Sequence, residues 1–218
     1  MVERRAGASN HGLFRNAAKR FWTKGFRVAA GYQEAQFLRR LQQCQRRDFC
    51  IIARNCLGGL PYQLLKIPYR TPTVGLFFRA KDYLRFASDL PRYLSTKLSF
   101  DTSHQAYPLG QIDDVEIHFL HYASEREAYE KWTRRVQRVD LSKVALIHTD
   151  REGVTQADLE AFEQLPYARK VCFTAKPNPL ASCVQITAYR DEPMVGDLYT
   201  NYRLFGRDFH FGHWLDSE

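Results

Sequence analysis

The sequence predicts an α/β fold of three layers, in which helices cover both faces of a mostly parallel sheet. Residues 115–174 show the order strand, helix, strand, helix, strand with short connections. Such connections require parallel strands and right-handed crossovers, as in a Rossmann-like βαβαβ unit. A capping residue precedes each helix of this unit. The composition agrees, because 218 residues with 44% hydrophobic content can bury the core of one domain.

Six apolar segments predict the strands of the sheet. The three strands of the βαβαβ unit are Val115–Tyr122, Lys143–Thr149 and Lys170–Thr174. The compact apolar run Phe49–Ala53 predicts the first core strand, and Thr73–Phe78 predicts the next. Cys183–Ala188 is expected at an edge, antiparallel to its neighbour.

Helix boundaries follow from capping residues and prolines. Ser124 opens the first helix of the unit, and Glu127 completes a capping box three residues later. Thr155 and Asp158 start the second helix, which Pro166 ends. Two further helices are predicted over Lys81–Ser88 and Pro91–Ser95.

The net charge of +8 is confined to the N-terminal quarter of the chain. Residues 1–54 hold twelve Lys or Arg against three acidic residues, whereas the remainder holds 20 against 21. The body therefore lacks the basic stripe that a specific nucleic-acid partner would require. We predict a basic helical N-terminal extension over residues 1–48 and a single α/β domain over residues 49–218.

The basic extension contains apolar residues at helical spacing from Leu13 to Trp22. A basic amphipathic helix of this kind predicts peripheral membrane contact through residues 13–27, and the alternative is packing on its own domain or on a second subunit. A second helix is expected over Gln33–Arg46. The chain has no apolar run of eighteen residues, and its five cysteines form no C-x-x-C motif. We therefore expect a cytoplasmic protein, peripheral at the inner face of the membrane if residues 13–27 contact it.

The carboxyl ends of parallel strands meet at one edge, where open α/β sheets bind ligands. His121 ends the first strand of the unit and is a candidate general base, although histidines on apolar strand faces are often hydrogen-bonded core residues. Asp150 is the second candidate catalytic residue. Arg151 and Lys176 would hold a phosphate or carboxylate, although Asp150 and Arg151 could instead close the turn by an ion pair.

The loop after the first core strand is a second candidate ligand site. Asn55, Gly58 and Gly59 would let a phosphate approach the backbone near a helix N-terminus, but a plain turn fits the same pattern. Cys56 could act as a nucleophile, yet a cysteine beside a core strand is more often a small buried apolar residue.

One acidic strand predicts a divalent cation site for Mn²⁺ or Mg²⁺. Asp114, Glu116 and His118 share a strand face, and their oxygen ligands suit such ions. Residues on one strand face are about 6 to 7 Å apart, so Asp114 with a distant partner is the form we expect. The alternative is a polar strand end that faces solvent or the arginines of residues 134–138.

Several short motifs resemble a known bacterial family. They are Asn55-Cys56 with Gly58-Gly59, Thr71–Phe77, Tyr107-Pro108 with Gly110, Asp113-Asp114 and Phe119–Tyr122. They resemble domain of unknown function 1919, whose members are often labelled exopolysaccharide or capsule biosynthesis proteins. The resemblance covers about Phe49–Trp214 and implies an α/β fold with a role in surface-polysaccharide assembly.

Together these observations predict a transferase in cell-surface polysaccharide biosynthesis that acts on a phosphate-bearing activated sugar donor, such as a sugar phosphate or nucleotide sugar. It would be glycosyltransferase-like or another sugar-modifying enzyme. The alternative is a non-catalytic interaction protein of a polysaccharide-assembly complex at the membrane surface.

Overall fold

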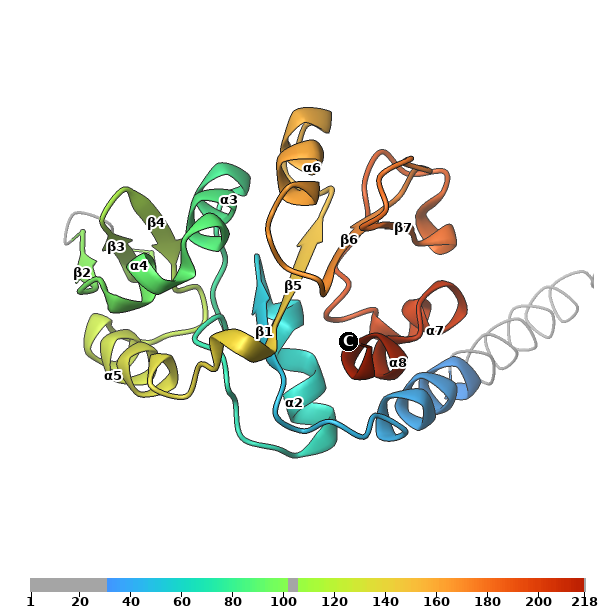
Figure 1. Ribbon diagram of the computed structural model, residues 1–218, viewed down its shortest axis with the longest axis horizontal. Helices are drawn as coiled ribbons and strands as arrows, with labels where there is room; N and C mark the ends of the chain where they lie inside the picture. Colours follow the sequence, from blue (N-terminus) through green and yellow to red (C-terminus); the bar gives the residue numbers. More distant parts are fainter. Residues whose placement is uncertain (1–30, 102–105, 218) are drawn as a thin grey trace, which may run out of the picture.

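A computed structural model describes residues 31–101 and 106–217, which form one parallel and one antiparallel sheet with helices around them (Figure 1). The parallel sheet has the order β1-β5-β6-β7, with β1 (Cys50–Ala53), β5 (Val144–Thr149), β6 (Lys170–Thr174) and β7 (Cys183–Gln185). The antiparallel sheet consists of β2 (Ser99–Phe100), β3 (Leu109–Ile112) and β4 (Val115–His118). In Figure 1 the small sheet lies beside β1, at the opposite end of the molecule from β7.

Helices cover both faces of the parallel sheet. They are α2 (Leu60–Leu65), α3 (Ala80–Ser88), α4 (Leu90–Ser95), α5 (Glu125–Val136), α6 (Gln156–Glu163), α7 (Phe205–Asp208) and α8 (Phe211–Asp216). Ile52, Leu146 and Cys172 pack with α3 to α6 in a first core cluster. Their strand neighbours, such as Ile51 and Ile147, pack with α2, α7 and α8 in a second. Because strand residues alternate between faces, these two clusters produce the predicted three layers.

The second half of the predicted βαβαβ unit is confirmed. β5 and β6 are parallel, and α6 connects them. Thr155 and Asp158 form the predicted capping box, in which each side chain accepts a hydrogen bond from the other residue's backbone N–H. Ser124 caps α5 by accepting a hydrogen bond from the Glu127 N–H. β1 is also present where it was expected, and it pairs in parallel with β5.

The prediction for the first half of that unit was wrong. Val115–Tyr122 is not one strand of the parallel sheet, because β4 ends at His118 and pairs with β3 in antiparallel register. Asp113 and Asp114 form the two-residue turn between these strands, and Asp113 adopts a φ of 53°. The two-residue turn brings β4 back alongside β3, so β4 pairs with this neighbour in the sequence and not with a strand of the parallel sheet. The chain then turns at residues 119–122, where the Tyr122 N–H donates to the Phe119 carbonyl.

Two other strand predictions also need correction. Thr73–Phe78 forms no regular strand, and its sheet contact is a single bridge between Phe77 and His118. The predicted edge strand Cys183–Ala188 ends at Gln185 and runs parallel to β6. Strand direction was misjudged because β6 and β7 are joined without a helix, and such connections are typical of antiparallel pairs.

The N-terminal helix that the structure describes covers residues 31–42. Its Phe37 and Leu41 are buried in the second core cluster with Phe205 and Phe211. The predicted membrane-contact segment, residues 13–27, lies outside the described residues. Within the described ranges, no helix is long and apolar enough to cross a membrane.

His148 is a buried histidine of β5 whose ring packs against residues of the first core cluster. Its side chain has no exposed surface, and its ring lies 5.3 Å from that of Tyr83 and 5.2 Å from that of Phe162, measured between centroids. Burial, aided by the nearby Arg54 guanidinium, lowers the pKa of His148 to about 3. The folded protein therefore holds His148 in its neutral form.

We predict that His148 makes the fold sensitive to mild acid. The unfolded chain binds a proton at this residue below about pH 6.5 whereas the folded chain does not, so stability falls as pH falls from about 6.5 toward 3. Between pH 7.5 and pH 5 this loss amounts to about 2 kcal/mol. Urea denaturation should show it in the wild type and not in His148→Phe.

The exposed His121 provides a matched control. His121→Ala should keep the wild-type pH dependence, since the substitution leaves the buried surroundings of His148 unchanged. Equal wild-type stability at pH 7.5 and pH 5 would contradict this account of His148.

Candidate functional site

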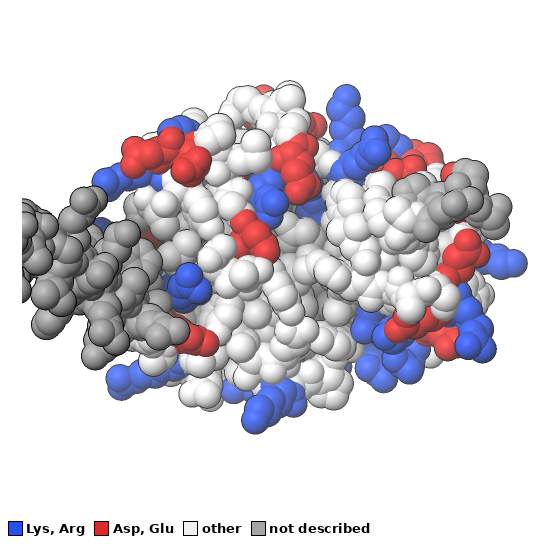
Figure 2. Space-filling model, turned by 180° about the vertical axis from the view of Figure 1, so that it is seen from behind, with Lys and Arg blue, Asp and Glu red and all other residues white. Residues whose placement is uncertain are grey.

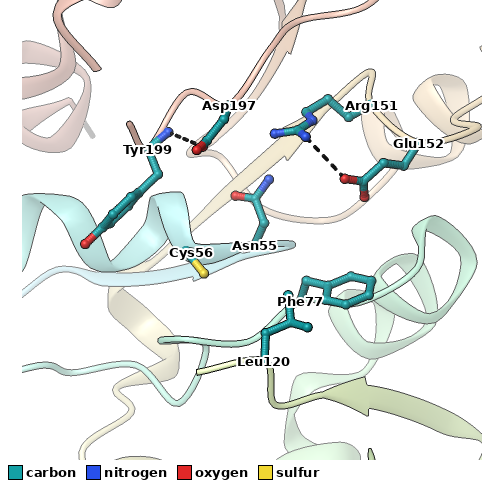
Figure 3. Close-up of a pocket in the computed structure, with 8 residues that line it drawn as sticks. All are labelled: Asn55, Cys56, Phe77, Leu120, Arg151, Glu152, Asp197 and Tyr199. Carbon is teal, nitrogen blue, oxygen red and sulfur yellow. Dashed lines mark hydrogen bonds and ion pairs between the residues drawn. The ribbon is translucent and has the colours of Figure 1, made fainter. Parts of the chain in front are cut away.

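A pocket of about 320 Å³ opens at the carboxyl end of β1 and β5 (Figure 3). It is lined by Asn55, Cys56, Phe77, Leu120, Arg151, Glu152, Asp197 and Tyr199. These residues come from five separate parts of the chain, which meet where the parallel sheet ends and the connection to the small sheet begins. The pocket therefore lies at the sheet edge where ligands of α/β proteins are usually bound.

Asn55 and Cys56 follow β1 directly. The Asn55 side chain caps the 3-10 helix Cys56–Gly59 by accepting a hydrogen bond from the Leu57 N–H at 3.1 Å. This bond fixes the side chain at the pocket wall, where its amide N–H₂ can donate to a ligand. Burial, and to a lesser degree the negative charge of Asp197, raises the pKa of the Cys56 thiol. Cys56 is therefore a neutral thiol near pH 7 and not an activated nucleophile.

Arg151 and Glu152 follow β5. The two side chains form an ion pair of 3.4 Å at the pocket wall. Glu152 has a left-handed backbone, with a φ of 59°, and Gly153 follows with a φ of 79°. This turn places the side chains of both Arg151 and Glu152 at the pocket.

A buried arginine holds Glu152 in place. The Arg54 side chain, 2% exposed, donates to the carbonyls of Phe78, Thr149 and Arg151 at 2.9 to 3.3 Å. Its remaining Nη2 donates to Glu152 Oε2 at 2.8 Å. The Glu152 carboxylate therefore bridges the buried Arg54 and the pocket residue Arg151. A fixed carboxylate of this kind is preorganised to accept a hydrogen bond from a ligand.

The remaining polar wall comes from the segment after β7. Asp197 accepts hydrogen bonds from the backbone N–H groups of Tyr199 and Thr200 and from the Thr200 hydroxyl. The Tyr199 hydroxyl donates to the Gln63 side chain at 2.8 Å. Asp197 adds a second carboxylate to the pocket, which is lined by one arginine among the described residues.

Phe77 and Leu120 form the apolar wall. Phe77 stacks on the His118 ring at a centroid distance of 4.2 Å. His118 is buried and lies between the Tyr107 hydroxyl, 3.0 Å from Nδ1, and Glu116 Oε1, 2.8 Å from Nε2. These contacts fix the Phe77 ring against the pocket. Glu116 and His118, two of the three residues predicted as metal ligands, contact each other here.

Residues 30–215 match the family described as Domain of unknown function (DUF1919). The chain belongs to the DUF1919 family. It is also 36% identical over 171 residues to an uncharacterised protein of Haemophilus influenzae, covering 76% of this chain and 83% of the relative. The pocket and all of its lining residues lie within the DUF1919 match.

Of the predicted site residues, the DUF1919 fold brings Asn55 and Arg151 together at the pocket. The predicted catalytic residue Asp150 is adjacent in sequence, but its carboxylate accepts hydrogen bonds from two backbone N–H groups. Oδ2 accepts from Ala175 at 2.7 Å, and Oδ1 accepts from Val195 at 2.8 Å. Asp150 thus joins the ends of β5 and β6 to the segment that carries Asp197.

The other predicted ligand residues do not line this pocket. Gly58 and Gly59 are buried, and a Cβ added to Gly58 would lie 2.5 Å from the Ala53 Cβ. Gly58 therefore allows close packing of the 3-10 helix on β1. Lys176 is exposed and donates to the Arg190 carbonyl at 2.6 Å. His121 is exposed next to the pocket residue Leu120, and its backbone N–H donates to the Gly75 carbonyl.

Asp114 was predicted to bind a divalent cation. Its Oδ1 accepts a hydrogen bond from the Tyr93 hydroxyl at 2.8 Å, and its Oδ2 lies 3.5 Å from Arg85. The Tyr93 hydrogen bond contributes most to lowering the pKa of Asp114. No group of three or more His, Cys, Asp or Glu among the residues of the described ranges could hold a metal ion. These surroundings do not fit Mn²⁺ or Mg²⁺.

Sequence reasoning missed Glu152, Asp197 and Tyr199. Glu152 carried a usable signal, because an acidic residue before Gly153 in a loop after a buried strand can adopt a left-handed turn. Asp197 and Tyr199 carried none, since their position depends on the tertiary contact through Asp150.

We predict that Asp150→Ala destabilises the fold rather than removing a pocket contact. The substitution leaves two backbone N–H groups without their charged acceptor, which should cost about 2 to 4 kcal/mol. Chemical denaturation measures this loss. Arg190→Ala, at an exposed side chain, should change stability by less than about 0.5 kcal/mol. An Asp150→Ala protein as stable as the wild type would contradict the structural role.

Proposed function

We propose that this DUF1919 protein is a transferase that binds the sugar end of a phosphate-bearing activated sugar in the pocket formed after β1 and β5. The observation that carries the proposal is the meeting of Arg151, Asn55 and two carboxylates with an apolar wall in a single pocket. The resemblance to capsule and exopolysaccharide proteins supports polysaccharide assembly as its setting.

The polar groups of the pocket suit a ligand that carries both a phosphate and hydroxyls. The Arg151 guanidinium has donors for a phosphate. Glu152 and Asp197 would accept hydrogen bonds from sugar hydroxyls, and the Asn55 amide would donate one. The apolar wall of Phe77 and Leu120 would cover the C–H face of a sugar ring. Inorganic phosphate alone would meet two carboxylates without the sugar hydroxyls that would satisfy them.

The size of the pocket supports a small ligand group. Ligand pockets of proteins span about 300 to 1,000 Å³, and this one measures about 320 Å³. A monosaccharide with its first phosphate suits this volume better than a complete nucleotide sugar, whose nucleoside would extend beyond the pocket. Within the pocket, Glu152 has the firmest support, so we assign it the hydrogen bond to the reacting or neighbouring hydroxyl.

The surface gives no comparable support for nucleic acid. On the face shown in Figure 2, Lys and Arg side chains are interspersed with Asp and Glu side chains and form no continuous basic stripe. Extended basic surfaces are the usual requirement for nucleic-acid binding. Peripheral membrane contact through residues 13–27 stays a prediction.

The test is thermal stabilisation of the purified chain by sugar 1-phosphates, nucleotide sugars and inorganic phosphate. A ligand at a hundred times its dissociation constant should stabilise the fold by about 2.7 kcal/mol. We expect a shift with a sugar-phosphate ligand and a much smaller one with inorganic phosphate. Arg151→Ala should remove the shift, because it removes the cation that pairs with the phosphate.

Arg190→Ala is the matched control, since this exposed arginine lies outside the pocket. It should retain the full shift. Phe77→Leu should weaken binding of sugar phosphates while leaving any response to inorganic phosphate unchanged. The absence of a shift with every donor would overturn the transferase proposal and favour a non-catalytic role in a polysaccharide-assembly complex.

A further inference from the structure

Two cysteines lie side by side on neighbouring strands, away from the pocket-lining residues. Cys172 of β6 and Cys183 of β7 are register partners in the parallel sheet. Partners on adjacent strands are about 4.8 Å apart. This spacing falls within the range of about 4.4 to 6.8 Å between the Cα atoms of a disulfide. Both side chains also face the first core cluster, so the two sulfurs are on the same side of the sheet.

The two thiols differ in their surroundings. Cys172 is completely buried, whereas Cys183 is partly exposed on the short strand β7 at the edge of the sheet. A hydrogen bond from Cys172 lowers the pKa of Cys183, and burial raises the pKa of Cys172. A partly exposed thiol of lowered pKa beside a second thiol is the usual arrangement of a redox-sensitive cysteine and its resolving partner.

The other three cysteines lack these properties. Burial raises the pKa of Cys44 to about 11 and that of Cys50 to about 12, and it also raises the pKa of Cys56. All three are free thiols, and none is a register partner of another cysteine. An oxidant should therefore react selectively at Cys183.

We propose that Cys183 is an oxidative modification site that forms a reversible disulfide with Cys172 when the protein meets a peroxide. The Cys183 thiolate attacks one peroxide oxygen, the O–O bond breaks, and a sulfenic acid and hydroxide form. The Cys172 sulfur then attacks the sulfenic sulfur, displaces its oxygen as hydroxide and loses its proton. In total, two thiols and one hydrogen peroxide give a disulfide and two waters. A dithiol reductant reverses the reaction.

The disulfide would join β7 covalently to β6 within the sheet. The backbone already connects these strands, since the Cys172 N–H donates to the Ser182 carbonyl at 2.8 Å and the Ile186 N–H donates to the Thr174 carbonyl at 2.8 Å. Little backbone movement is therefore needed for the sulfurs to bond. This inference does not depend on the transferase proposal, because neither cysteine lines the pocket.

The test begins with the reduced, full-length protein and one equivalent of hydrogen peroxide. Peptide mapping by mass spectrometry should find a Cys172–Cys183 cross-linked peptide with the loss of two hydrogens, and dithiothreitol should remove it. Cys183→Ser should abolish the cross-link, and Cys172→Ser should leave a Cys183 sulfenic acid that dimedone traps. Cys56→Ser is the matched control and should cross-link like the wild type.

A second measurement needs no variant. Alkylation of the untreated wild type at pH 7 should modify Cys183 at least about tenfold faster than Cys56, because the thiolate is the reacting form. Equal rates would overturn the proposal. It would also be overturned if peroxide produced no Cys172–Cys183 peptide, or if Cys183 were oxidised to sulfinic acid without a cross-link in the wild type.

Discussion

The turn that carries two residues of the pocket depends on the side chain of Arg54. Arg54 follows β1, yet its guanidinium is bonded to carbonyls before α3 and after β5, and to the Glu152 carboxylate. Burying a guanidinium is costly unless its donors are satisfied, and here four donor contacts satisfy it. Burial lowers the pKa of Arg54 and the Glu152 charge opposes this effect. The turn that carries Arg151 and Glu152 is thus held in place by Arg54, the residue that follows β1.

This arrangement gives the pocket an unusual distribution of charge. The two oxygens of the Glu152 carboxylate pair with different arginines. Oε2 lies 2.8 Å from Arg54, and Oε1 lies 3.4 Å from Arg151. A ligand phosphate would draw on Arg151 without leaving Glu152 unpaired, because Arg54 continues to balance it. In the function that we propose, the pocket would therefore accept the phosphate and keep a carboxylate for a sugar hydroxyl.

Local signals in the sequence were sufficient to predict the central layer of the fold and part of the site. The capping box of α6 and the apolar runs of β1, β5 and β6 predicted those elements, and the carboxyl-edge rule predicted Arg151 at the sheet edge. Asn55 was predicted as part of a separate ligand site after β1, and the structure joins the two in one pocket. The hairpin of β3 and β4 was missed because Asp114, in its turn, was interpreted as a metal ligand at the start of a strand of the parallel sheet. That error also placed His121 at the end of a strand of the parallel sheet, whereas it lies in the turn after β4. Asp197 could not have been predicted, since a hydrogen bond to Asp150 from a distant segment determines its place.

The carboxylate of Asp150 holds together the two ends of a long segment of the chain. Ala175 and Val195, the residues at its two ends, donate to the same carboxylate, so residues 176–194, including β7, leave and return at one point. The wall that carries Asp197 is consequently fixed independently of the path in between. The exposed residues 190–193 can therefore change in length or sequence while the Asp150 carboxylate still holds Ala175 and Val195. A change in the outer part of this loop would thus be separated from the pocket by the anchor at Asp150.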